Sequence, residues 1–268
     1  MDQASILSMF SLVGQTALIT GGTRGIGQAM ALALAEVGAD IILVQRDVEN
    51  LETKKAVEAL GRKATVYTAD LSSQPSVAGI VPAVLKDGHS IQILINCAGI
   101  NKRHPSHQFP DSDLNEVMQV NLNATFSLCR DVGAHMLSQP LPASGRRGSI
   151  LNFGSLLSFQ GGLNVAVYAA SKGAIAQLTK ALSNEWAGQG ITVNAIAPGY
   201  VVTDMNESLL KNEERLRSIN ERIPAGRWGE VGDFKAAAVF LCGSGGSYVT
   251  DMFWPLMVGG LRGRFAVV

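Results

Sequence analysis

The chain alternates short apolar runs with longer segments in which apolar residues recur at helical spacing. The short runs are rich in β-branched residues and predict strands at 16–20, 40–44, 64–67, 91–96, 149–153 and 191–196. The longer segments predict helices at 26–38, 48–60, 111–138 and 168–187. Because parallel strands are joined by right-handed crossovers through helices, this alternation predicts an α/β fold, a doubly wound parallel sheet with helices on both faces.

The predicted strands are continuously apolar, which indicates that both faces of the sheet are buried. A chain of 268 residues, 47% of them hydrophobic, is long enough for one large core, and no repeat, linker or low-complexity stretch divides it. We therefore expect a single domain over residues 1–268. The segment 139–148 is the most loop-like part and is predicted to be a solvated turn before the fifth strand.

Composition narrows the class of partner. The 22 basic residues balance 22 acidic ones and the sequence pI is about 6.9, so no net field attracts nucleic acid or an anionic membrane. The uncharged run 148–171 contains Asn152, Gln160, Asn164 and several glycines, which a hydrocarbon core would not accept. Small molecules are the expected partners.

The three cysteines are Cys97, Cys129 and Cys242, an odd number without CxxC spacing. They predict free thiols in a reducing, cytoplasmic compartment, and no metal site is expected from them. The first ten residues carry the acidic Asp2, and no Lys or Arg precedes Arg24, so the start of the chain does not read as a signal peptide.

A glycine cluster runs from Thr20 to Gly27, directly after the first predicted strand and at the start of the first predicted helix. In an open parallel sheet, ligands bind beyond the carboxyl ends of the strands. Glycines at this turn allow a pyrophosphate to approach bare backbone at a helix N-terminus. The alternative is a tight strand-to-helix turn that uses glycine for steric reasons only.

The end of the second predicted strand bears on the choice of dinucleotide. A site for NAD usually presents a carboxylate here to the ribose hydroxyls, whereas this chain has Gln45 and Arg46. A guanidinium can hold a 2'-phosphate by two hydrogen bonds, and Arg24 could approach the same group, which favours NADP(H). Two alternatives stay open: Arg46 is a solvated cation, or Asp47 holds the unphosphorylated ribose of NAD(H).

Tyr168 and Lys172 stand four residues apart on a predicted helix, so their side chains share one face. A phenol is a poor acid or base at neutral pH, and a neighbouring ammonium lowers its pKa by stabilising the phenolate. Ser155, just after the fifth predicted strand, could donate a hydrogen bond to a substrate oxygen. The alternatives are a half-buried helical tyrosine and a surface lysine whose stem packs on apolar neighbours.

With these motifs in place, the chain resembles the short-chain dehydrogenase/reductase family from about residue 12 to about residue 250. The family's TGxxxGxG loop appears at Thr20 to Gly27, its NNAG motif at Asn96 to Gly99, and its PG motif at Pro198 and Gly199. The resemblance implies a Rossmann-type sheet of about seven strands, a homotetramer or dimer, and reversible carbonyl reduction. It implies a dinucleotide-binding half over about 12–140 and a catalytic and substrate half over about 148–268.

The resemblance assigns roles residue by residue. The implied catalytic residues are Asn121, Ser155, Tyr168 and Lys172. The cofactor-binding residues proposed from the motifs and the resemblance together are Gly21, Thr23, Arg24, Gly25, Ile26, Gly27, Arg46, Asp70, Leu71, Asn96, Ala98, Gly99, Tyr168, Lys172, Pro198, Gly199, Val201 and Thr203. In the implied reaction Tyr168 delivers a proton, while Lys172 lowers the phenol pKa and holds the nicotinamide ribose. Asn121 positions a water that relays protons to Lys172.

Within the family, the segments 155–162, 184–186, 194–200 and 222–229 resemble those of two groups of sugar-acid enzymes, the 2-deoxy-D-gluconate 3-dehydrogenases and the 2-dehydro-3-deoxy-D-gluconate 5-dehydrogenases. Those enzymes carry a basic pair after the NNAG motif, matched here by Lys102 and Arg103. Arg103, with Lys102 beside it, is therefore a candidate to bind a substrate carboxylate, the alternative being a solvated basic loop with His104 and His107.

Two other readings of function remain at this stage: reduction of a larger carbonyl compound in a biosynthetic pathway, and a dinucleotide-binding scaffold without turnover. The resemblance leaves the substrate open, because the segments 100–110 and 203–228 are expected to choose it. The C-terminal segment departs from the family's V-D-G-G ending, reading Leu256-Met257-Val258-Gly259-Gly260 after Pro255. Because proline cannot donate to a sheet ladder, this strand is predicted to lie at an edge, shifted, or poorly formed.

Overall fold

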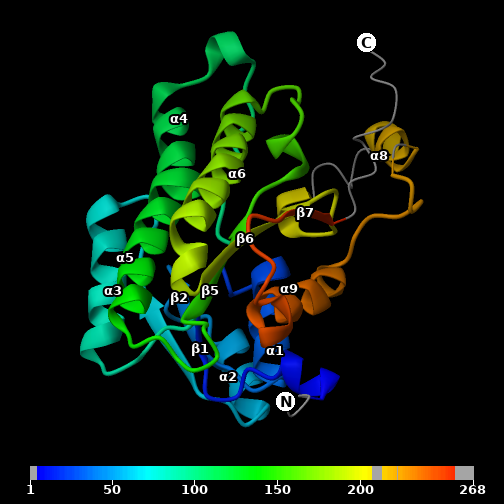
Figure 1. Ribbon diagram of the computed structural model, residues 1–268. Coiled ribbons are helices and arrows are strands. Elements are labelled where there is room, and N and C mark those ends of the chain that lie inside the picture. Colours follow the sequence, from blue (N-terminus) through cyan, green and yellow to red (C-terminus); the bar gives the residue numbers. More distant parts are fainter. Residues whose placement is uncertain (1–4, 207–212, 222, 257–268) are drawn as a thin grey trace.

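A computed structural model describes residues 5–206, 213–221 and 223–256. All of its strands belong to one parallel sheet in the order β3-β2-β1-β4-β5-β6-β7 (Figure 1). The strands are β1 (Thr16–Thr20), β2 (Asp40–Gln45), β3 (Ala64–Thr68), β4 (Ile93–Asn96), β5 (Gly148–Phe153), β6 (Ile191–Pro198) and β7 (Phe253–Leu256). The strand order reverses between β1 and β4, which is where open α/β sheets form a ligand crevice.

Helices cover both faces of this sheet, which confirms the doubly wound Rossmann-type fold (Figure 1). They are α1 (Gly25–Glu36), α2 (Glu52–Ala59), α3 (Gln74–Lys86), α4 (Asp111–Met118), α5 (Ala124–Ser138), α6 (Ala166–Trp186), α8 (Glu213–Asn220) and α9 (Lys235–Cys242). Single turns are η1 (Ile6–Phe10), η2 (Ser106–Gln108), the π-helical η3 (Gln119–Asn123), η4 (Leu156–Ser158), η5 (Ala187–Gln189), η6 (Asp204–Asn206), η7 (Val231–Phe234) and η8 (Ser244–Gly246).

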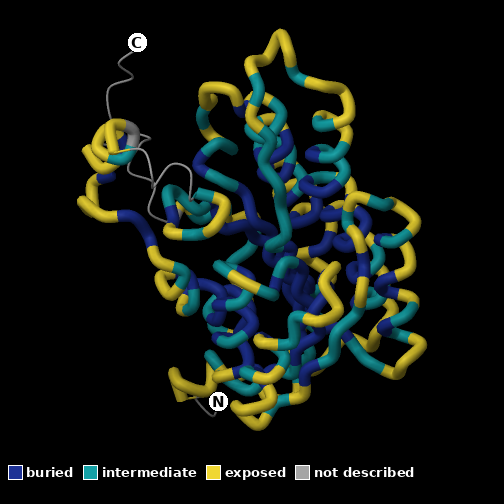
Figure 2. The backbone as a smooth tube through the Cα atoms, turned by 180° about the vertical axis from the view of Figure 1, so that it is seen from behind, coloured by how far each residue is buried: buried dark blue, intermediate teal, exposed yellow. Residues whose placement is uncertain are grey.

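The sheet separates two apolar cores because successive side chains of a strand point to opposite faces. In β1, Ile19 packs with α1 and α9, whereas Leu18 packs with α3, α5 and α6. Both side chains are fully buried. The buried parts of the chain are concentrated in the sheet and the helix sides that face it (Figure 2). The strands are thus continuously apolar because both faces of the sheet are buried, as expected.

Residues 139–145 of the predicted turn are exposed and lie between α5 and β5, whereas Gly148, at the end of the predicted range, is already a buried residue of β5. The predicted strands lie where the sequence placed them, with ends that differ by a few residues: β4 begins at Ile93 rather than at 91, and β6 continues to Pro198. The helix predicted at 111–138 is interrupted by the π-helical turn η3, which carries Asn121. The helices α3, α8 and α9 were not predicted from the sequence.

Within the residues that the structure describes, β7 lies at the edge of the sheet and pairs with β6 alone, so of the three outcomes expected from Pro255 the edge position is observed. Asn194 of β6 holds the preceding segment by accepting from the Met252 N–H at 3.0 Å and donating to the Val249 carbonyl at 2.7 Å. The unusual residues 257–260 lie outside the described residues. In the described part of the chain, no helix has the length and apolarity needed to cross a membrane.

Candidate active site

The turn between β1 and α1 depends on glycine. Gly21 has a positive φ of 69°, and a Cβ there would come within 2.8 Å of the Ala98 Cα. A Cβ on Gly27 would come within 2.1 Å of the Gly21 carbonyl oxygen. The Thr20 hydroxyl accepts from the Ala98 N–H at 3.3 Å, so this turn packs directly on the end of β4.

The same turn fits a pyrophosphate group. No side chain caps the first turn of α1, whose N-terminal amides therefore have no side-chain acceptor among the described residues. Uncapped amides at a helix N-terminus are suited to bind an anion. Gly25 has a positive φ of 58°, and a Cβ there would lie 3.7 Å from the Thr203 Cγ2, so the turn and the segment after β6 face each other closely. Thr23 and Ile26 belong to this turn and are partly buried.

Arg24, which we expected near a 2'-phosphate, instead pairs with Asp204 of η6 at 3.1 Å. Both side chains are more than two-thirds exposed, at 77% and 69%, so the pair is well solvated and contributes little on its own. The pair joins the glycine turn to the segment that follows Thr203.

At the end of β2, Gln45 and Arg46 differ in environment. Gln45 is buried, and its Nε2 donates to the carbonyls of Asp47 and Asn50, so it holds the following turn rather than facing a ligand. Arg46 is exposed, and its charge is one of the contributions that lower the pKa of Asp70. The largest contribution is the hydrogen bond from the Ser72 N–H to the Asp70 carboxylate.

Asp47, the residue that could have held an NAD ribose, uses a carboxylate oxygen to accept from the Glu49 N–H at 2.9 Å. Leu71, next to Asp70, is half-buried, and its carbonyl accepts from Gln119 Nε2 at 3.3 Å. Arg46, rather than Gln45 or Asp47, is therefore the group at the end of β2 that has no hydrogen bond or ion pair within the described residues.

The motif from Asn96, the last residue of β4, to Gly99 contains residues in different environments. The Asn96 amide is buried and donates to the Asn152 side chain at 3.0 Å, so it links β4 to β5 inside the core. Gly99, in contrast, lies beside the candidate catalytic groups: a Cβ there would lie 3.3 Å from Asn121 Oδ1 and 3.5 Å from Lys172 Nζ. Gly99 thus approaches the candidate catalytic groups, and Cys97 of the same motif is close enough to Lys172 and Tyr168 to affect their pKa values.

The Asn121 side chain is fully engaged in binding protein groups. Its Oδ1 accepts from the Ile100 N–H at 2.9 Å, and its Nδ2 donates to the Ile100 carbonyl at 2.9 Å and to the Ser171 hydroxyl at 3.1 Å. Ser171 in turn donates to the Tyr168 carbonyl at 2.7 Å. Asn121 therefore joins the segment after β4 to the helix α6, and the π-helical turn aims its side chain inward.

Lys172 is 5% exposed, and its Nζ donates to the carbonyl of Phe153, the last residue of β5, at 2.7 Å. The same Nζ lies 5.8 Å from the centre of the Tyr168 ring. Burial is the larger of the causes that shift this group and lowers the pKa of Lys172 to about 8. The i, i+4 spacing of the two residues has the expected effect of bringing them together.

Tyr168 is half-buried, and burial is the main cause that raises the pKa of its phenol. A hydrogen bond with the Ser155 side chain and the charge of Arg103 both act to lower that pKa. We expected Lys172 to be the group that lowers it. In this structure the ammonium is directed at the Phe153 carbonyl, and the two opposing contributions come from Ser155 and Arg103 instead.

The loop that carries Arg103 is braced on α4 by the residues on either side of Arg103. Lys102 pairs with Glu116 at 3.0 Å and with Asp113 at 3.6 Å, and His104 contacts Asp113 at 2.6 Å. Arg103 is exposed and forms no ion pair with any residue that the structure describes. Lys102 thus pairs with α4, whereas Arg103, near Tyr168, can bind a ligand without first breaking an ion pair to a described residue.

After β6, Pro198 and Gly199 are half-buried, and Val201 is buried and forms a bridge with Gly229. Thr203 faces Gly25, as described above. The segment 203–228, which we expected to choose the substrate, includes 207–212 and 222, which lie outside the described residues. The part that is described contributes a small apolar cluster of Ile219, Ile223 and Trp228.

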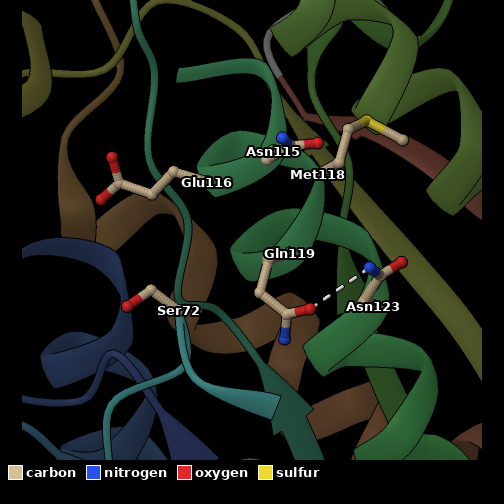
Figure 3. Close-up of a pocket in the computed structure, with 6 residues that line it drawn as sticks. All are labelled: Ser72, Asn115, Glu116, Met118, Gln119 and Asn123. Carbon is tan, nitrogen blue, oxygen red and sulfur yellow. Dashed lines mark hydrogen bonds between the residues drawn. The ribbon is translucent and has the colours of Figure 1, made fainter. Parts of the chain in front are cut away.

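A separate open pocket of about 470 Å³ lies beside α4, lined by Ser72, Asn115, Glu116, Met118, Gln119 and Asn123 (Figure 3). Its lining includes none of the candidate catalytic residues. Gln119 accepts from Asn123 Nδ2 at 3.2 Å, and also donates to Gln74. The pocket adjoins Asp70 and Leu71 through Ser72 and Gln119 but contains no candidate catalytic residue, so the candidate active site is defined by the ends of the strands.

The glycine turn and the Ser, Tyr, Lys and Asn set described so far all lie within the part of the chain that matches a known family. The family model for short chain dehydrogenase matches residues 15–214. The chain belongs to the short-chain dehydrogenase family. It is accordingly an oxidoreductase that acts on CH–OH groups with a nicotinamide dinucleotide.

Individual members of the short-chain dehydrogenase family are similar over almost the whole chain. A 2-dehydro-3-deoxy-D-gluconate 5-dehydrogenase from Pseudoalteromonas atlantica is 46% identical over 97% of this chain and 100% of its own length. A crystal structure of a putative NAD(P)-dependent gluconate 5-dehydrogenase from Beutenbergia cavernae, with bound NADP at low occupancy, has a TM-score of 0.88 and 40% identity, covering 95% of this chain and 99% of its own.

A gluconate 5-dehydrogenase from Burkholderia cenocepacia, crystallised with NADP and tartrate, has a TM-score of 0.89 and 34% identity, covering 97% of this chain and 100% of its own. The fold and the family expected from the motifs are thus confirmed. The roles of individual residues remain predictions.

Three residues of this short-chain dehydrogenase contact its candidate site but were not predicted from the sequence. Asp204 pairs with Arg24, Ser171 joins Asn121 to Tyr168, and Ser158 contacts both Ser155 and Lys172. For Ser158 a signal was available, because a hydroxyl three residues after a helix-capping serine can complete a capping box. For Asp204 the sequence offers no signal, since its partner is distant in the chain.

Proposed function

We propose that this chain is an NADP(H)-dependent oxidoreductase that interconverts a secondary alcohol and a ketone on a sugar acid. The observation that carries the proposal is the joint position of Arg103 and Ser155 beside Tyr168, since both groups affect the Tyr168 phenol. A cation at that point suits a substrate with a carboxylate close to its reacting carbonyl. The relatives described above, which are named for gluconate and its keto derivatives, support the same substrate class.

NADP(H) is the proposed cofactor, with NAD(H) as the alternative. Arg46 supports this choice because it is an exposed cation, without an ion pair in the described residues, close enough to Asp70 to lower its pKa. Two of the similar structures contain NADP. The proposed set that holds the dinucleotide comprises the glycine turn, the ends of β2, β4 and β6, and the residues after β3.

In the proposed reaction the bound dinucleotide supplies the hydride. Ser155 Oγ accepts from the Leu157 N–H at 3.2 Å and hydrogen-bonds the Tyr168 phenol, so in the proposal its O–H turns to donate to the substrate oxygen when substrate binds. Tyr168 gives its proton to that oxygen in the reduction direction and takes it back in oxidation. Its raised pKa keeps the phenol protonated at neutral pH, which suits a proton donor.

Lys172 and Asn121 have supporting roles in the proposal. Lys172, whose Nζ donates to the Phe153 carbonyl at the end of β5, is proposed to hold the nicotinamide ribose when the dinucleotide binds. Asn121 keeps the segment after β4 and the helix α6 at a fixed separation through Ile100 and Ser171. Its main-chain or side-chain role in ordering a relay water stays a prediction from the family resemblance.

The experiment for this proposal is turnover by the purified protein with NADPH and with NADH, against keto sugar acids and bulkier neutral ketones, followed at the nicotinamide absorbance. We expect the keto sugar acids to be reduced and NADPH to be preferred. Turnover of neutral ketones alone would contradict the sugar-acid assignment, and equal use of the two cofactors would contradict the NADP(H) assignment.

Arg103→Ala tests the proposed carboxylate contact. We expect the KM for acidic substrates to rise about ten- to a hundredfold while the kinetics with neutral ketones stay nearly unchanged, because a charge-assisted contact is lost only where a carboxylate is present. The matched control is Arg130→Ala, which removes an exposed arginine paired with Asp131 on α5. Equal effects of Arg103→Ala on acidic and neutral substrates would contradict the assignment.

We also propose, from the family resemblance, a homo-oligomer, a tetramer or a dimer; the three cysteines without CxxC spacing favour a cytoplasmic location, and the chain length favours a single domain. Light scattering of the purified protein measures the oligomeric state directly. A particle mass equal to that of one 28.3 kDa chain would contradict it.

A further inference from the structure

The hydroxyl of Ser158 connects two of the candidate catalytic residues through their backbones. Ser158 is the last residue of η4, and its Oγ accepts from the Ser155 N–H at 3.1 Å. The same Oγ donates to the Lys172 carbonyl oxygen at 2.7 Å. A single hydroxyl therefore joins the segment after β5 to the helix α6.

The turn η4 and the helix α6 do not need Ser158 in order to form, although its Oγ is the only acceptor of the Ser155 N–H among the described residues. The turn η4 is already closed by backbone hydrogen bonds from the Ser158 N–H to the Ser155 carbonyl at 2.9 Å and from the Phe159 N–H to the Leu156 carbonyl at 3.1 Å. The Lys172 carbonyl lies inside α6, where helix geometry also lets it accept from the N–H of the residue four positions later. What the Ser158 hydroxyl adds is the connection between the two elements.

That connection fixes the part of the site where alignment matters most. Tyr168 and Lys172 belong to α6, while Ser155 belongs to the turn after β5. The elements are joined at a second point by the Lys172 side chain, which donates to the Phe153 carbonyl at 2.7 Å. With both connections in place, the Ser155 hydroxyl is held at a fixed distance from the Tyr168 phenol.

We propose that Ser158 is a positioning residue, which holds Ser155 in register with Tyr168 and Lys172 without contacting substrate or cofactor itself. The inference rests on the proposed function, since it requires the roles given above to Ser155, Tyr168 and Lys172. It predicts that the loss of one hydroxyl at 158 affects the chemical step more than the binding steps, because small misplacements of reacting groups are costly.

The kinetic test compares Ser158→Ala, which removes both hydrogen bonds, with Ser158→Thr, which keeps a hydroxyl. Ser158→Ala is expected to lower kcat about tenfold or more, with the KM of the ketone and the Kd of NADPH within about twofold of the parent. Ser158→Thr is expected to restore most of the lost rate. The matched control is Ser183→Ala, which removes a buried hydroxyl farther along α6 that contacts Thr250 at 2.7 Å.

A second readout does not depend on turnover. The Ser155 hydrogen bond lowers the pKa of Tyr168, so release of Ser155 should raise that pKa further. The other groups that face the phenol are Arg103, Cys97 and Lys172, none of which is altered by the substitution. Phenolate absorbance, taken as a difference against Tyr168→Phe to exclude the other tyrosines, should shift to higher pH by about half a pH unit or more in Ser158→Ala and return in Ser158→Thr.

The outcomes separate the inference from the proposed function. If Ser158→Ala keeps kcat within about twofold of the parent and leaves the Tyr168 titration in place, the positioning role is overturned. It is also overturned if Ser183→Ala loses as much kcat as Ser158→Ala, because the effect is then one of general stability. If Ser155→Ala itself retains full activity, the proposed function fails, and the titration alone decides whether Ser158 holds Ser155.

Discussion

The Tyr168 hydroxyl is governed by competing influences at close range. Burial raises its pKa, while the hydrogen bond of Ser155 and the charge of Arg103 act in the opposite direction. Lys172 is buried as well, and the pKa of its ammonium falls to about 8. The phenol thus stays protonated at neutral pH, as the proposed proton donor must be, whereas the lysine is the group whose charge changes just above neutrality.

This difference gives a prediction for the pH dependence of carbonyl reduction. Because the pKa of Lys172 is lowered, its protonated fraction is nearly complete at pH 6 and declines as the pH rises through about 8. If the ammonium is required, kcat/KM for the reduction should stay flat at low pH and fall along a limb centred near pH 8. The kcat/KM profile reports groups of the free enzyme, so it is the right measurement. A profile that stays flat to pH 10 would contradict a required ammonium.

At the scale of single elements, the strands were the most predictable part. Their apolar β-branched runs are short and bounded by polar residues, so the pattern has one reading. α3 was not identified because Pro75, Gly79 and Pro82 all weaken a helical pattern. The helix forms nevertheless, with Ser73 capping its first turn and Pro75 inside that turn, where a missing N–H has no cost.

The helix α9 was missed for another reason. It has only eight residues, Lys235–Cys242, which are apolar after Lys235, and so short an apolar run does not distinguish a buried helix from a strand by periodicity. The π-helical turn at Asn121 was also not visible, since the apolar pattern continues through 111–138 without a break. In these cases tertiary packing decides what the local pattern leaves undetermined.

The candidate site divides in the same way. Residues placed at the carboxyl ends of strands, such as Ser155 and Gly99, could be predicted because a parallel sheet gathers those ends at one edge. Side-chain partners could not, because they depend on which rotamer the surrounding fold allows. Asn96 turns into the core and Arg24 pairs with Asp204, and neither choice is recorded in the local sequence.

The ends of β2 and β3 give a prediction for the cofactor. Arg46→Asp should reverse or erase the preference for NADPH over NADH, because a charge-assisted contact contributes about 1.5 to 3 kcal/mol, or roughly tenfold and upward in affinity. Dissociation constants from cofactor titrations measure it. As a control, Arg62→Ala alters an arginine at the opposite end of β2, where it pairs with Asp40, and should leave the preference unchanged. Equal affinities of the unaltered protein for both cofactors would contradict the assignment.

At the scale of the whole molecule, the sheet order explains why residues far apart in sequence form one site. β1 lies between β2 and β4, and β5 and β6 follow on the same side, so the glycine turn faces the segments that carry Gly99, Ser155 and Thr203. The helix α6 then brings Tyr168 and Lys172 to the end of β5. The central claim is that this assembled site passes a hydride from NADPH to the carbonyl carbon of a keto sugar acid.

The most direct measurement of that claim uses NADPH with deuterium at the transferable position of the nicotinamide and a keto sugar acid as acceptor. The product is examined by mass spectrometry and NMR. The account predicts one deuterium on the newly formed carbinol carbon, and predicts that Tyr168→Phe binds NADPH normally while forming this product at less than about a tenth of the rate, a barrier increase above about 1.4 kcal/mol. Oxidation of NADPH without deuterium in the product, or a Tyr168→Phe protein that retains more than about a tenth of the rate, would contradict it.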